Sequence, residues 1–296
     1  CDLYKDKVEN LAWDQDRISE AVITAENSDV VILCVGLNET LEGEEGDTGN
    51  SDASGDKVDL HLPKVQEELI EKVTAVGKPT IVVLMAGSAI DLNYAQNNCN
   101  GILLAWYPGA RGGRAVADLL FGKESPSGKL PVTFYKDLEG MPEFTDYSMK
   151  NRTYRYMEKE ALYPFGYGLT YSDTCVTEAE VVGEVSAESD IMLKATVKNN
   201  GTVDTDEVVQ VYIKDLDSPL AVRNYSLCGF KRVYLKAGEE KSVEFTISNK
   251  AMNIVDEDGN RYIAGKYFRL FAGVSQPDTR SAELTGHKPA EVEIAL

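Results

Sequence analysis

The sequence predicts an α/β three-layer sandwich in the first half of the chain and an all-β sandwich of immunoglobulin or fibronectin III type in the second. In the first half, short apolar strands alternate with amphipathic helices, which is typical of a parallel sheet covered on both faces. In the second half, short strands alternate apolar and polar residues, which is typical of a β-sandwich. The 296 residues are enough for two hydrophobic cores. We expect the α/β domain at 1–170, a linker at 171–188 and the β-domain at 189–296.

The α/β half is predicted to be a regular succession of helices and strands. A helix is expected at 13–27, where apolar residues recur at helical spacing, and the apolar run 30–35 follows it as a buried strand. Pro63 suits the first turn of the next helix, and Gly77 suits the position just after its end. Further buried strands are expected at 80–85 and 101–106, and further helices at 91–97 and 111–121. This order of elements predicts parallel strands joined by right-handed crossovers.

The β half is predicted to consist of short strands separated by turns. Apolar and polar residues alternate strictly at 191–197, and a turn is expected at 199–201. The remaining expected strands lie at 209–213, 243–247, 261–263 and 267–274, with a tight turn at 256–260. Several short alternating strands in succession predict a single β-sandwich.

The chain is acidic, with 49 aspartates and glutamates against 30 lysines and arginines and a formal net charge of −19. Nucleic-acid binding requires clustered Lys and Arg, so no nucleic-acid partner is expected, and neither is attachment to an anionic membrane surface. No apolar run approaches the ~20 residues of a transmembrane helix. The first residues also lack the basic start and apolar core of a signal peptide. A cytoplasmic location is therefore favoured, with a secreted mature chain as the alternative.

The cysteines and histidines limit the kinds of site that the chain can build. The five cysteines are scattered and odd in number, so reduced thiols are expected rather than a disulfide framework or a zinc ribbon. With only two histidines, His61 and His287, a three-histidine zinc site cannot be built within this chain. No glycine-rich phosphate-binding motif follows a strand. The sequence therefore predicts no metal and no cofactor.

A long acidic segment at 37–59 separates the first predicted strand from the second predicted helix. It begins at the carboxyl end of a parallel strand, where open α/β sheets bind ligands, and it is longer than an ordinary connection. Seven carboxylates lie within eighteen positions of it: Glu39, Glu42, Glu44, Glu45, Asp47, Asp52 and Asp56. Crowded carboxylates raise one another's pKa values, which keeps a carboxyl group protonated for general-acid catalysis. A solvated acidic loop and a weak calcium site are the alternatives.

A second candidate segment follows the predicted strand 101–106. Flat rings such as those of Trp106 and Tyr107 can stack on the C–H face of a sugar, and the N–H groups at the start of the next helix can bind hydroxyl groups or an anion. The alternative is that Pro108 and the neighbouring glycines only shape the turn. We predict Trp106, Tyr107 and Arg111 as substrate-binding residues.

Several stretches of the chain resemble the C-terminal half of glycoside hydrolase family 3 β-glucosidases. These stretches are VGLNETLEGEEGD (35–47), GDKVDLHLP (55–63), GKPTIVVLMAGSAIDL (77–92), ILLAWYPGARGGRAVADLLFGKESPSGKLPVTF (102–134) and NRTYRYMEKEALYPFGYGLTYS (151–172). The resemblance covers nearly the whole chain. It implies an (α/β)6-type sandwich domain followed by a fibronectin type III-like domain.

The resemblance also implies an enzyme whose active site is shared between domains. Members of the family carry a (β/α)8-type barrel domain that supplies the aspartate nucleophile and most of the sugar-binding site, and no barrel fits in this chain. We expect the barrel in the same or in another chain, and we expect these 296 residues alone to be inactive. The implied function is part of a retaining β-glucosidase acting on β-glucosides or cello-oligosaccharides. A β-xyloside substrate and a non-catalytic carbohydrate-binding or scaffold module are the alternatives, and a homo-oligomer is left open.

In the family, the general acid/base glutamate comes from the acidic loop. Many members read ESEGxDRxxLxLP there, whereas in this chain the segment EGEEGD (42–47) is followed by an insertion before Asp56 and Lys57. The insertion leaves the register of the glutamate open. The resemblance favours Glu44 as the acid/base, with Glu42 second and Glu45 third.

Overall fold

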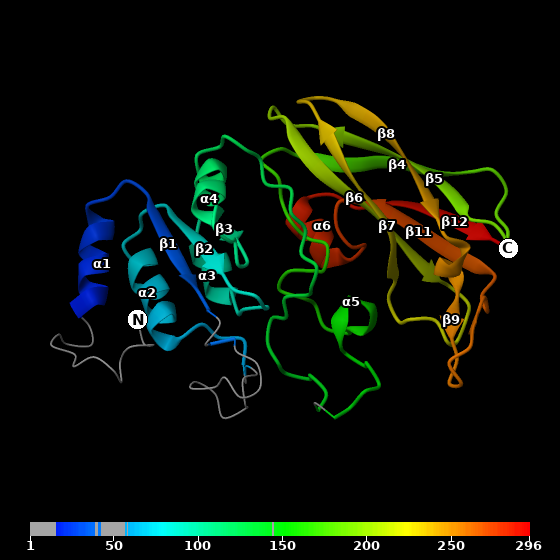
Figure 1. Ribbon diagram of the computed structural model, residues 1–296, viewed down its shortest axis with the longest axis horizontal. Coiled ribbons are helices and arrows are strands. Elements are labelled where there is room, and N and C mark those ends of the chain that lie inside the picture. The colour runs from blue at the N-terminus through cyan, green and yellow to red at the C-terminus, as the bar shows by residue number, and fades with distance from the viewer. Residues whose placement is uncertain (1–15, 39–40, 43–56, 58, 144) are drawn as a thin grey trace. The chain divides into compact units, whose positions relative to one another are not determined.

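The chain folds into two compact units, which Figure 1 shows as a ribbon. The first unit comprises the residues up to Val116 together with 136–138, and the second comprises 117–135 together with 139–296. This computed structural model describes residues 16–38, 41–42, 57, 59–143 and 145–296. One unit carries a parallel sheet with helices and the other carries antiparallel sheets, which matches the two halves expected from the sequence.

The first unit is built on a parallel sheet in the order β1-β2-β3. Its strands are β1 (Val31–Gly36), β2 (Thr80–Met85) and β3 (Gly101–Leu104). Successive side chains of a strand point to opposite faces, and residues 82–84 of the central strand β2 are all at most 1% exposed. Both faces of β2 are therefore covered, as in α/β layered proteins. This confirms the predicted α/β class.

Among the described residues, the helices of the first unit are α1 (Asp16–Glu26), α2 (Lys64–Thr74) and α3 (Asn93–Asn98), and α4 (Gly112–Leu120) begins in the first unit and ends in the second. α1 contacts α2, α2 contacts β1, and α3 contacts β3. Pro63 stands at the N-cap of α2, where its missing N–H group costs no helical hydrogen bond. Within the described ranges the parallel sheet has three strands, fewer than the six that the family resemblance implies.

The second unit is a β-sandwich of two antiparallel sheets. One sheet has the order β12-β11-β6-β7 and the other has the order β4-β5-β8. The strands are β4 (Thr174–Val182), β5 (Ile191–Asn199), β6 (Thr205–Asp215), β7 (Ser226–Leu235), β8 (Glu240–Ile247), β11 (Tyr267–Gly273) and β12 (Ala290–Ala295). Smaller elements are α5 (Thr153–Tyr156), a 3-10 helix (Asn249–Met252), β9 (Ile254–Val255), β10 (Arg261–Tyr262) and α6 (Thr279–Thr285).

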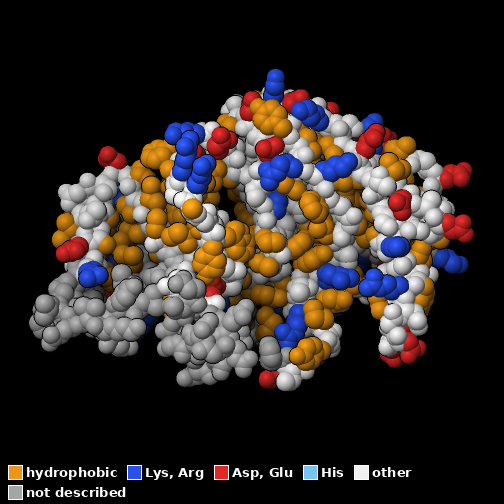
Figure 2. All heavy atoms as spheres, viewed as in Figure 1, with side chains coloured by type: hydrophobic (Ala, Val, Ile, Leu, Met, Phe, Trp, Pro, Cys, Tyr) orange, Lys and Arg blue, Asp and Glu red, His pale blue; other side chains and the backbone are white. Residues whose placement is uncertain are grey.

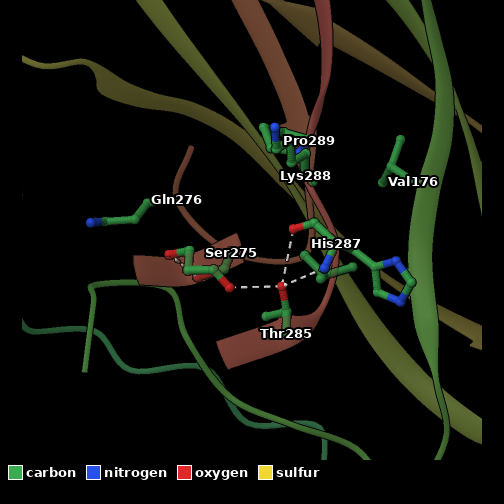
Figure 3. A pocket seen from close by; sticks show the side chains of 10 residues that line it. Val176, Ser275, Gln276, Thr285, His287, Lys288 and Pro289 are labelled. Atoms are coloured by element: carbon green, nitrogen blue, oxygen red, sulfur yellow. Dashed lines mark hydrogen bonds between the residues drawn. The ribbon is translucent and has the colours of Figure 1, made fainter. Parts of the chain in front are cut away.

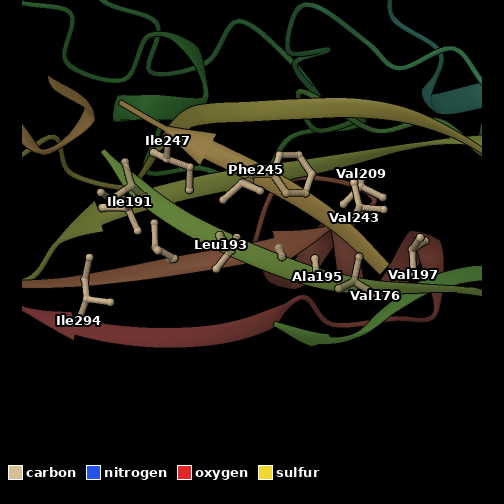
Figure 4. Close-up of a cluster of buried hydrophobic side chains, with 14 of the residues drawn as sticks. Val176, Ile191, Leu193, Ala195, Val197, Val209, Val243, Phe245, Ile247 and Ile294 are labelled. Carbon is tan, nitrogen blue, oxygen red and sulfur yellow. The ribbon is translucent and has the colours of Figure 1, made fainter. Parts of the chain in front are cut away.

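Alternating side chains of the two sheets form the core of the β-sandwich, part of which is drawn in Figure 4. On β5, every second residue from Ile191 to Val197 is buried in this core, whereas the residues between them are more exposed. Phe245 on β8 and Val209 on β6 contribute to the same cluster from the two different sheets. The apolar residues that recur at every second position in the sequence are therefore the ones that the strands bury in the core.

The segment predicted as a linker, 171–188, contains the strand β4, so the linker prediction is corrected for residues 174–182. β4 pairs antiparallel with β5, and the pairing register shifts between Val176 and Glu178. Such a bulge inserts one extra residue and changes which residues face the core. The alternation of apolar and polar residues is interrupted there, which is why the pattern does not reveal the strand.

Residues 139–170 belong to the second unit, although the sequence places the end of the first domain at residue 170. An aromatic cluster holds part of this segment on the β-sandwich. The Tyr154 and Phe165 rings stack with their centroids 4.3 Å apart. Both rings pack against a buried group that contains Tyr212 on β6 and Tyr225 just before β7. These contacts explain why the segment folds with the strands that follow it.

Residues 121–173, between α4 and β4, form the connecting segment, and a buried ion pair holds another part of it against the β-sandwich. Lys129 Nζ lies 2.8 Å from Glu207 Oε1, and the two side chains are 9% and 1% exposed. Lys129 also donates to the Gly168 carbonyl oxygen at 2.6 Å, and the Thr174 hydroxyl donates to Glu207 at 2.6 Å. Because both charges have hydrogen-bonding partners, the cost of burying them is offset.

Basic and acidic side chains are interspersed over the β-sandwich on the face that Figure 2 draws, and they form no single basic patch there. Among the residues described, no helix is both long and apolar enough to cross a membrane.

Candidate functional site

The candidate site lies at the carboxyl ends of the three parallel strands, where open α/β sheets place their ligands. β1 ends at Gly36, whose backbone comes so close to β2 that an added Cβ would lie 1.8 Å from the Met85 carbonyl oxygen. The Gln66 side chain of α2 accepts from the Gly36 N–H group at 2.7 Å and donates to the Gly36 carbonyl oxygen at 2.9 Å. The start of the acidic loop is therefore fixed to both the neighbouring strand and α2.

The Glu42 carboxylate lies at the centre of a set of hydrogen-bond donors. The Gly87 N–H group donates to it at 2.7 Å, and the hydroxyl groups of Ser88 and Tyr107 also donate to it. Burial of the carboxyl raises the pKa of Glu42, but the bonds from Ser88, Tyr107 and Gly87 and the charge of Lys57 outweigh that effect. The pKa of Glu42 therefore lies below its usual range, and the group is an ionised acceptor near neutral pH.

Lys57 lies near Glu42 at the other end of the acidic loop. Its ammonium group donates to the Ala89 carbonyl oxygen at 2.9 Å. Burial lowers the pKa of Lys57, and the charges of Glu42 and Asp59 partly offset this effect. The amino acids that follow β2, residues 87–89, thus contact both ends of the loop.

Gly87 is the residue that allows these groups to come together. An added Cβ at this position would lie 2.7 Å from Tyr107 Cε2 and 3.2 Å from Glu42 Oε2. The first of these distances is too short for two carbon atoms without a shift of the ring. Glycine at the end of β2 is therefore a requirement of the packing between the Tyr107 ring and the Glu42 carboxylate.

The predicted acid/base residues are only partly described. Glu42 is placed as above, whereas Glu44 and Glu45 lie outside the described residues. The other loop carboxylates that lie outside them are Glu39, Asp47, Asp52 and Asp56.

The three predicted substrate-binding residues differ in exposure, backbone conformation and hydrogen bonding. Tyr107 is 52% exposed and its hydroxyl donates to Glu42. Trp106 has a left-handed backbone with φ of +51°, a conformation that costs energy in a non-glycine residue and persists only when its surroundings hold it. Arg111 is exposed and directly precedes α4. The structure brings Tyr107 and Glu42 together, and sequence reasoning does not identify Gly87 and Ser88 as their partners.

The second unit contains a small pocket beside the β-sandwich strands (Figure 3). It is lined by residues from β4, from the end of β11 and from α6 and the residues after it, among them Ser275, Thr285 and His287. Thr285 Oγ1 bonds the carbonyl oxygen and the N–H group of His287, at 3.1 and 3.3 Å. The pocket has room for about one water molecule. It is therefore too small for a sugar ring.

Among the side chains that the structure describes, no group of three or more His, Cys, Asp and Glu residues is arranged to hold a metal ion. The chemistry available in the described part of the site is that of a carboxylate, an ammonium group, two hydroxyl groups and backbone N–H donors.

Comparison with known proteins places the whole chain in one family. Residues 3–171 match the profile of the Glycosyl hydrolase family 3 C-terminal domain, and residues 207–276 match that of a Fibronectin type III-like domain. The chain is 40% identical over 270 residues to a xylan 1,4-beta-xylosidase of Xylanibacter ruminicola, covering 90% of this chain and 31% of that protein. It is 34% identical over 282 residues to a beta-xylosidase of Formosa agariphila, and the match covers 93% of this chain and 38% of that protein.

Solved structures give the same result. A β-glucosidase from Erythrobacter marinus superposes with a TM-score of 0.80 at 32% identity, over 98% of this chain and 38% of that one. The chain spans about a third of the length of each of these relatives. Because the family's C-terminal profile covers more than half of the residues, the chain belongs to glycoside hydrolase family 3.

Proposed function

We propose that this chain is the C-terminal part of a retaining β-glycosidase and supplies its general acid/base glutamate from the acidic loop 37–59. The observation that carries the proposal is the Glu42 site, a set of hydrogen-bonded polar groups at the carboxyl ends of the parallel strands in a chain of glycoside hydrolase family 3. The aspartate nucleophile comes from a (β/α)8-type barrel domain, in the same or in another polypeptide. The chain's share of about a third of its relatives' length leaves room for that domain.

Glu44 remains the first candidate for the acid/base, ahead of Glu42 and Glu45. A general acid has to be protonated at the working pH, so its pKa is usually raised. The pKa of Glu42 is lowered instead, because three hydrogen-bond donors and a nearby ammonium group stabilise its ionised form. This supports a role for Glu42 as an acceptor rather than as the proton donor, and Glu44 is two residues further along the same loop.

The reaction is a double displacement. The barrel aspartate attacks the anomeric carbon while Glu44 gives its proton to the leaving oxygen, and Glu44 then takes a proton from the water that hydrolyses the glycosyl–enzyme ester. The anomeric configuration is retained because the carbon is inverted twice. The two carboxyl groups stand about 5–5.5 Å apart in the assembled enzyme.

The substrate is a terminal β-linked sugar, and the comparisons favour a β-xyloside. The two curated relatives described above carry xylosidase names at 40% and 34% identity, whereas a Bacteroides ovatus relative with the name beta-glucosidase is 32% identical. A β-glucoside or cello-oligosaccharide, the substrate that the sequence resemblance implies, is the second candidate. The ratio of kcat/KM for the aryl β-xyloside to that for the aryl β-glucoside decides between them, and a ratio below one favours the glucosidase.

Replacement of Glu44 in the complete polypeptide tests the acid/base assignment. Glu44→Gln removes the proton donor, so hydrolysis of substrates with poor leaving groups should fall by about 10²–10⁴-fold. Activated aryl glycosides should suffer less, because their leaving groups need little protonation. Azide should restore deglycosylation and give a β-glycosyl azide, because it needs no general base. Wild-type kinetics of Glu44→Gln would overturn the assignment, and inactivity of the complete polypeptide towards all β-glycosides would favour a non-catalytic carbohydrate-binding module.

A further inference from the structure

We propose that the outer face of strand β7 binds a neutral glycan chain through Phe230, Arg232 and Tyr234. We call these three residues the β7 strip. The strip belongs to the second unit, whereas the Glu42 site belongs to the first, so it is a further site and not a part of the one already described. The choice of a glycan as the ligand rests on the membership of the chain in a glycoside hydrolase family, and the geometry of the strip rests on described residues alone.

The β7 strip exposes two aromatic rings on one face of a sheet. Phe230 is 67% exposed and Tyr234 is 49% exposed. Val233 and Leu235 belong to the core of the β-sandwich, and successive side chains of a strand alternate between its two faces. Phe230, Arg232 and Tyr234 therefore point outward together. The pairing of β7 with β6 is uninterrupted from Phe230 to Leu235, so no bulge turns one ring away from the other.

The sheet holds the two rings at a fixed separation. Four residues at about 3.3 Å each place the Cα atoms of Phe230 and Tyr234 about 13 Å apart. β7 is the last strand in the order of its sheet, so its outer edge has no partner strand among the described residues. A chain-like ligand can therefore lie along the strand and contact both rings at once. Because the rings have few rotatable bonds and a rigid support, binding costs little conformational entropy.

The exposed face of an aromatic ring suits the apolar face of a sugar. The π face is electronegative, whereas the C–H bonds of a sugar ring carry a small positive charge. Between the two rings, the Arg232 guanidinium presents N–H donors that a hydroxyl oxygen can accept. The succession of ring, donor and ring matches a glycan, in which apolar C–H faces alternate with hydroxyl groups. In an enzyme that removes terminal sugars, such a strip keeps the polypeptide on a polymer, because contacts at two sites bind more tightly than contacts at one.

The charge of Arg232 is already neutralised within the protein. Its Nη1 lies 3.9 Å from Asp206 Oδ2, and it also donates to the hydroxyl of Ser127 in the connecting segment. An anionic ligand would have to compete with Asp206 for the guanidinium group. A hydroxyl group can instead bind to the N–H donors that remain, without disturbing the ion pair.

The second cation beside the β7 strip is paired as well. Lys241 Nζ lies 5.8 Å from the centroid of the Tyr234 ring and 3.3 Å from Glu239 Oε2. The Tyr234 hydroxyl donates to Asp204 Oδ2 at 2.9 Å, which fixes the direction of the ring. Because both cations have carboxylate partners, the strip favours an uncharged ligand over a nucleic acid or an anionic membrane.

Electrophoresis of the 296-residue chain through native gels that contain soluble xylan or hydroxyethyl cellulose tests the proposal. We expect at least one polymer to retard the wild type. Phe230→Ala and Tyr234→Ala should each raise Kd at least about fivefold, as for the loss of an aromatic anchor. The matched controls Tyr262→Ala and Tyr267→Ala remove rings that are 43% and 57% exposed on β10 and β11, and they should leave Kd unchanged.

All four rings are exposed, so the variants should fold, which circular dichroism verifies. No retardation of the wild type by either polymer would overturn the proposal. Wild-type Kd in the double variant Phe230→Ala/Tyr234→Ala would overturn it too, because binding would then occur elsewhere on the chain.

Two further measurements separate a glycan from other occupants of the β7 strip. A dimer in sedimentation equilibrium that is lost in Phe230→Ala would assign the strip to a second copy of the chain and overturn the proposal. If the complete polypeptide fails to bind a polymer that the 296-residue chain binds, another domain covers the strip, and the proposal is overturned as well.

Kinetics of the complete polypeptide keep this proposal separate from the proposed function. Phe230→Ala/Tyr234→Ala should leave kcat/KM for a small aryl β-glycoside unchanged and raise KM for the polymer that binds. An equal loss with the aryl glycoside would place the rings in the catalytic site and overturn their separate role. Polymer binding by an inactive polypeptide would refute only the proposed function, and activity without polymer binding would refute only the β7 strip.

Discussion

At the scale of single residues, the thiol groups have different surroundings. Cys34 is exposed on β1, whereas burial raises the pKa of the Cys99 thiol and raises that of Cys228 to about 12. The thiolate is the reactive form, so a raised pKa and burial both slow modification. We expect Ellman's reagent at pH 8 to modify Cys34 first, Cys99 more slowly and Cys228 only after unfolding.

The thiol prediction is checked in a Cys1→Ser background by mass spectrometry of the modified chain over time. Cys34→Ser is the matched control and should remove the fast phase without affecting the slower ones. Modification of Cys228 at the rate of Cys34 would contradict the burial of β7 residues against β6.

His61 supplies a residue-scale test of pH dependence. Its Nδ1 lies 2.9 Å from Glu67 Oε1, and the hydrogen bond to Glu67 raises the pKa of His61 above its usual value of 6.5. A group whose pKa is raised by folding stabilises the protein fully below its unfolded-state pKa, and that stabilisation disappears as the pH rises through the folded-state pKa. NMR titration should place the His61 midpoint above 6.5, and Glu67→Gln should bring it down.

The same linkage predicts how stability depends on pH. Glu67→Gln should lower the free energy of unfolding below pH 6.5 and have no effect at pH values well above the folded-state pKa of His61. Equal stability of the two proteins at pH 5.5, measured by urea unfolding, would contradict the prediction.

Sequence reasoning names Glu42 and Tyr107 separately but does not predict their partners. The position of the acidic loop after a parallel strand predicts a carboxylate site, and Glu42 is the second of three acid/base candidates there. Ser88 and Tyr107 are 46 and 65 residues away from Glu42. A contact over such separations depends on strand order and register, which one sequence does not determine.

At the scale of elements, the buried ion pair between Lys129 and Glu207 should dominate the attachment of the connecting segment to β6. Removing one partner leaves an unpaired buried charge, so Lys129→Met should destabilise the second unit by about 3–5 kcal/mol. The double variant Lys129→Met/Glu207→Leu should recover much of this loss, because no charge is then left unpaired.

Urea unfolding followed by circular dichroism measures the change, with hydrogen exchange of the β6 amides to assign it to the second unit. The matched control is Lys123→Ala, which removes an ion pair in which the lysine side chain is 70% exposed, and which should cost less than about 1 kcal/mol. Equal effects of the Lys129 and Lys123 substitutions would show that burial of the first pair has no energetic consequence.

The predictability of each element follows from how regularly it buries its side chains. β5 alternates without interruption and is predicted, whereas β4 contains a bulge and is predicted as linker. The third parallel strand is predicted at 101–106 but ends at Leu104, because Trp106 takes a left-handed conformation that no strand allows. Hydrophobic periodicity reports burial, so elements with local irregularities are missed or placed with shifted ends.

At the scale of the whole molecule, we expect the 296-residue chain to show no glycosidase activity by itself. Retaining hydrolysis needs two carboxyl groups on opposite sides of the anomeric carbon, and one of them belongs to the proposed barrel domain. The purified chain should release no nitrophenol from aryl β-xylosides or aryl β-glucosides. Turnover that co-purifies with the chain and is abolished by Glu44→Gln would contradict the proposed division of the active site.

The sequence predicts the division into an α/β part and an all-β part, but not where the compact units divide. The predicted boundary at residue 170 lies where the pattern changes to that of alternating strands, whereas residues 139–170 fold with the β-sandwich, with Tyr154 and Phe165 in its aromatic cluster. These residues have neither helical nor strand periodicity, so their attachment depends on contacts that only the three-dimensional structure reveals.

The close approach of the β1 and β2 backbones at Gly36 has a consequence for the evolution of the protein in the laboratory. In a saturation library, position 36 should return glycine alone, because any side chain would have to occupy the place of the Met85 carbonyl oxygen. Gly113 on the first turn of α4 has no atom within 4 Å of an added Cβ, so it should accept alanine freely. Selection in such a library can therefore vary other residues around the strand ends, but every folded variant should keep glycine at position 36 and with it the same backbone path from β1 into the loop.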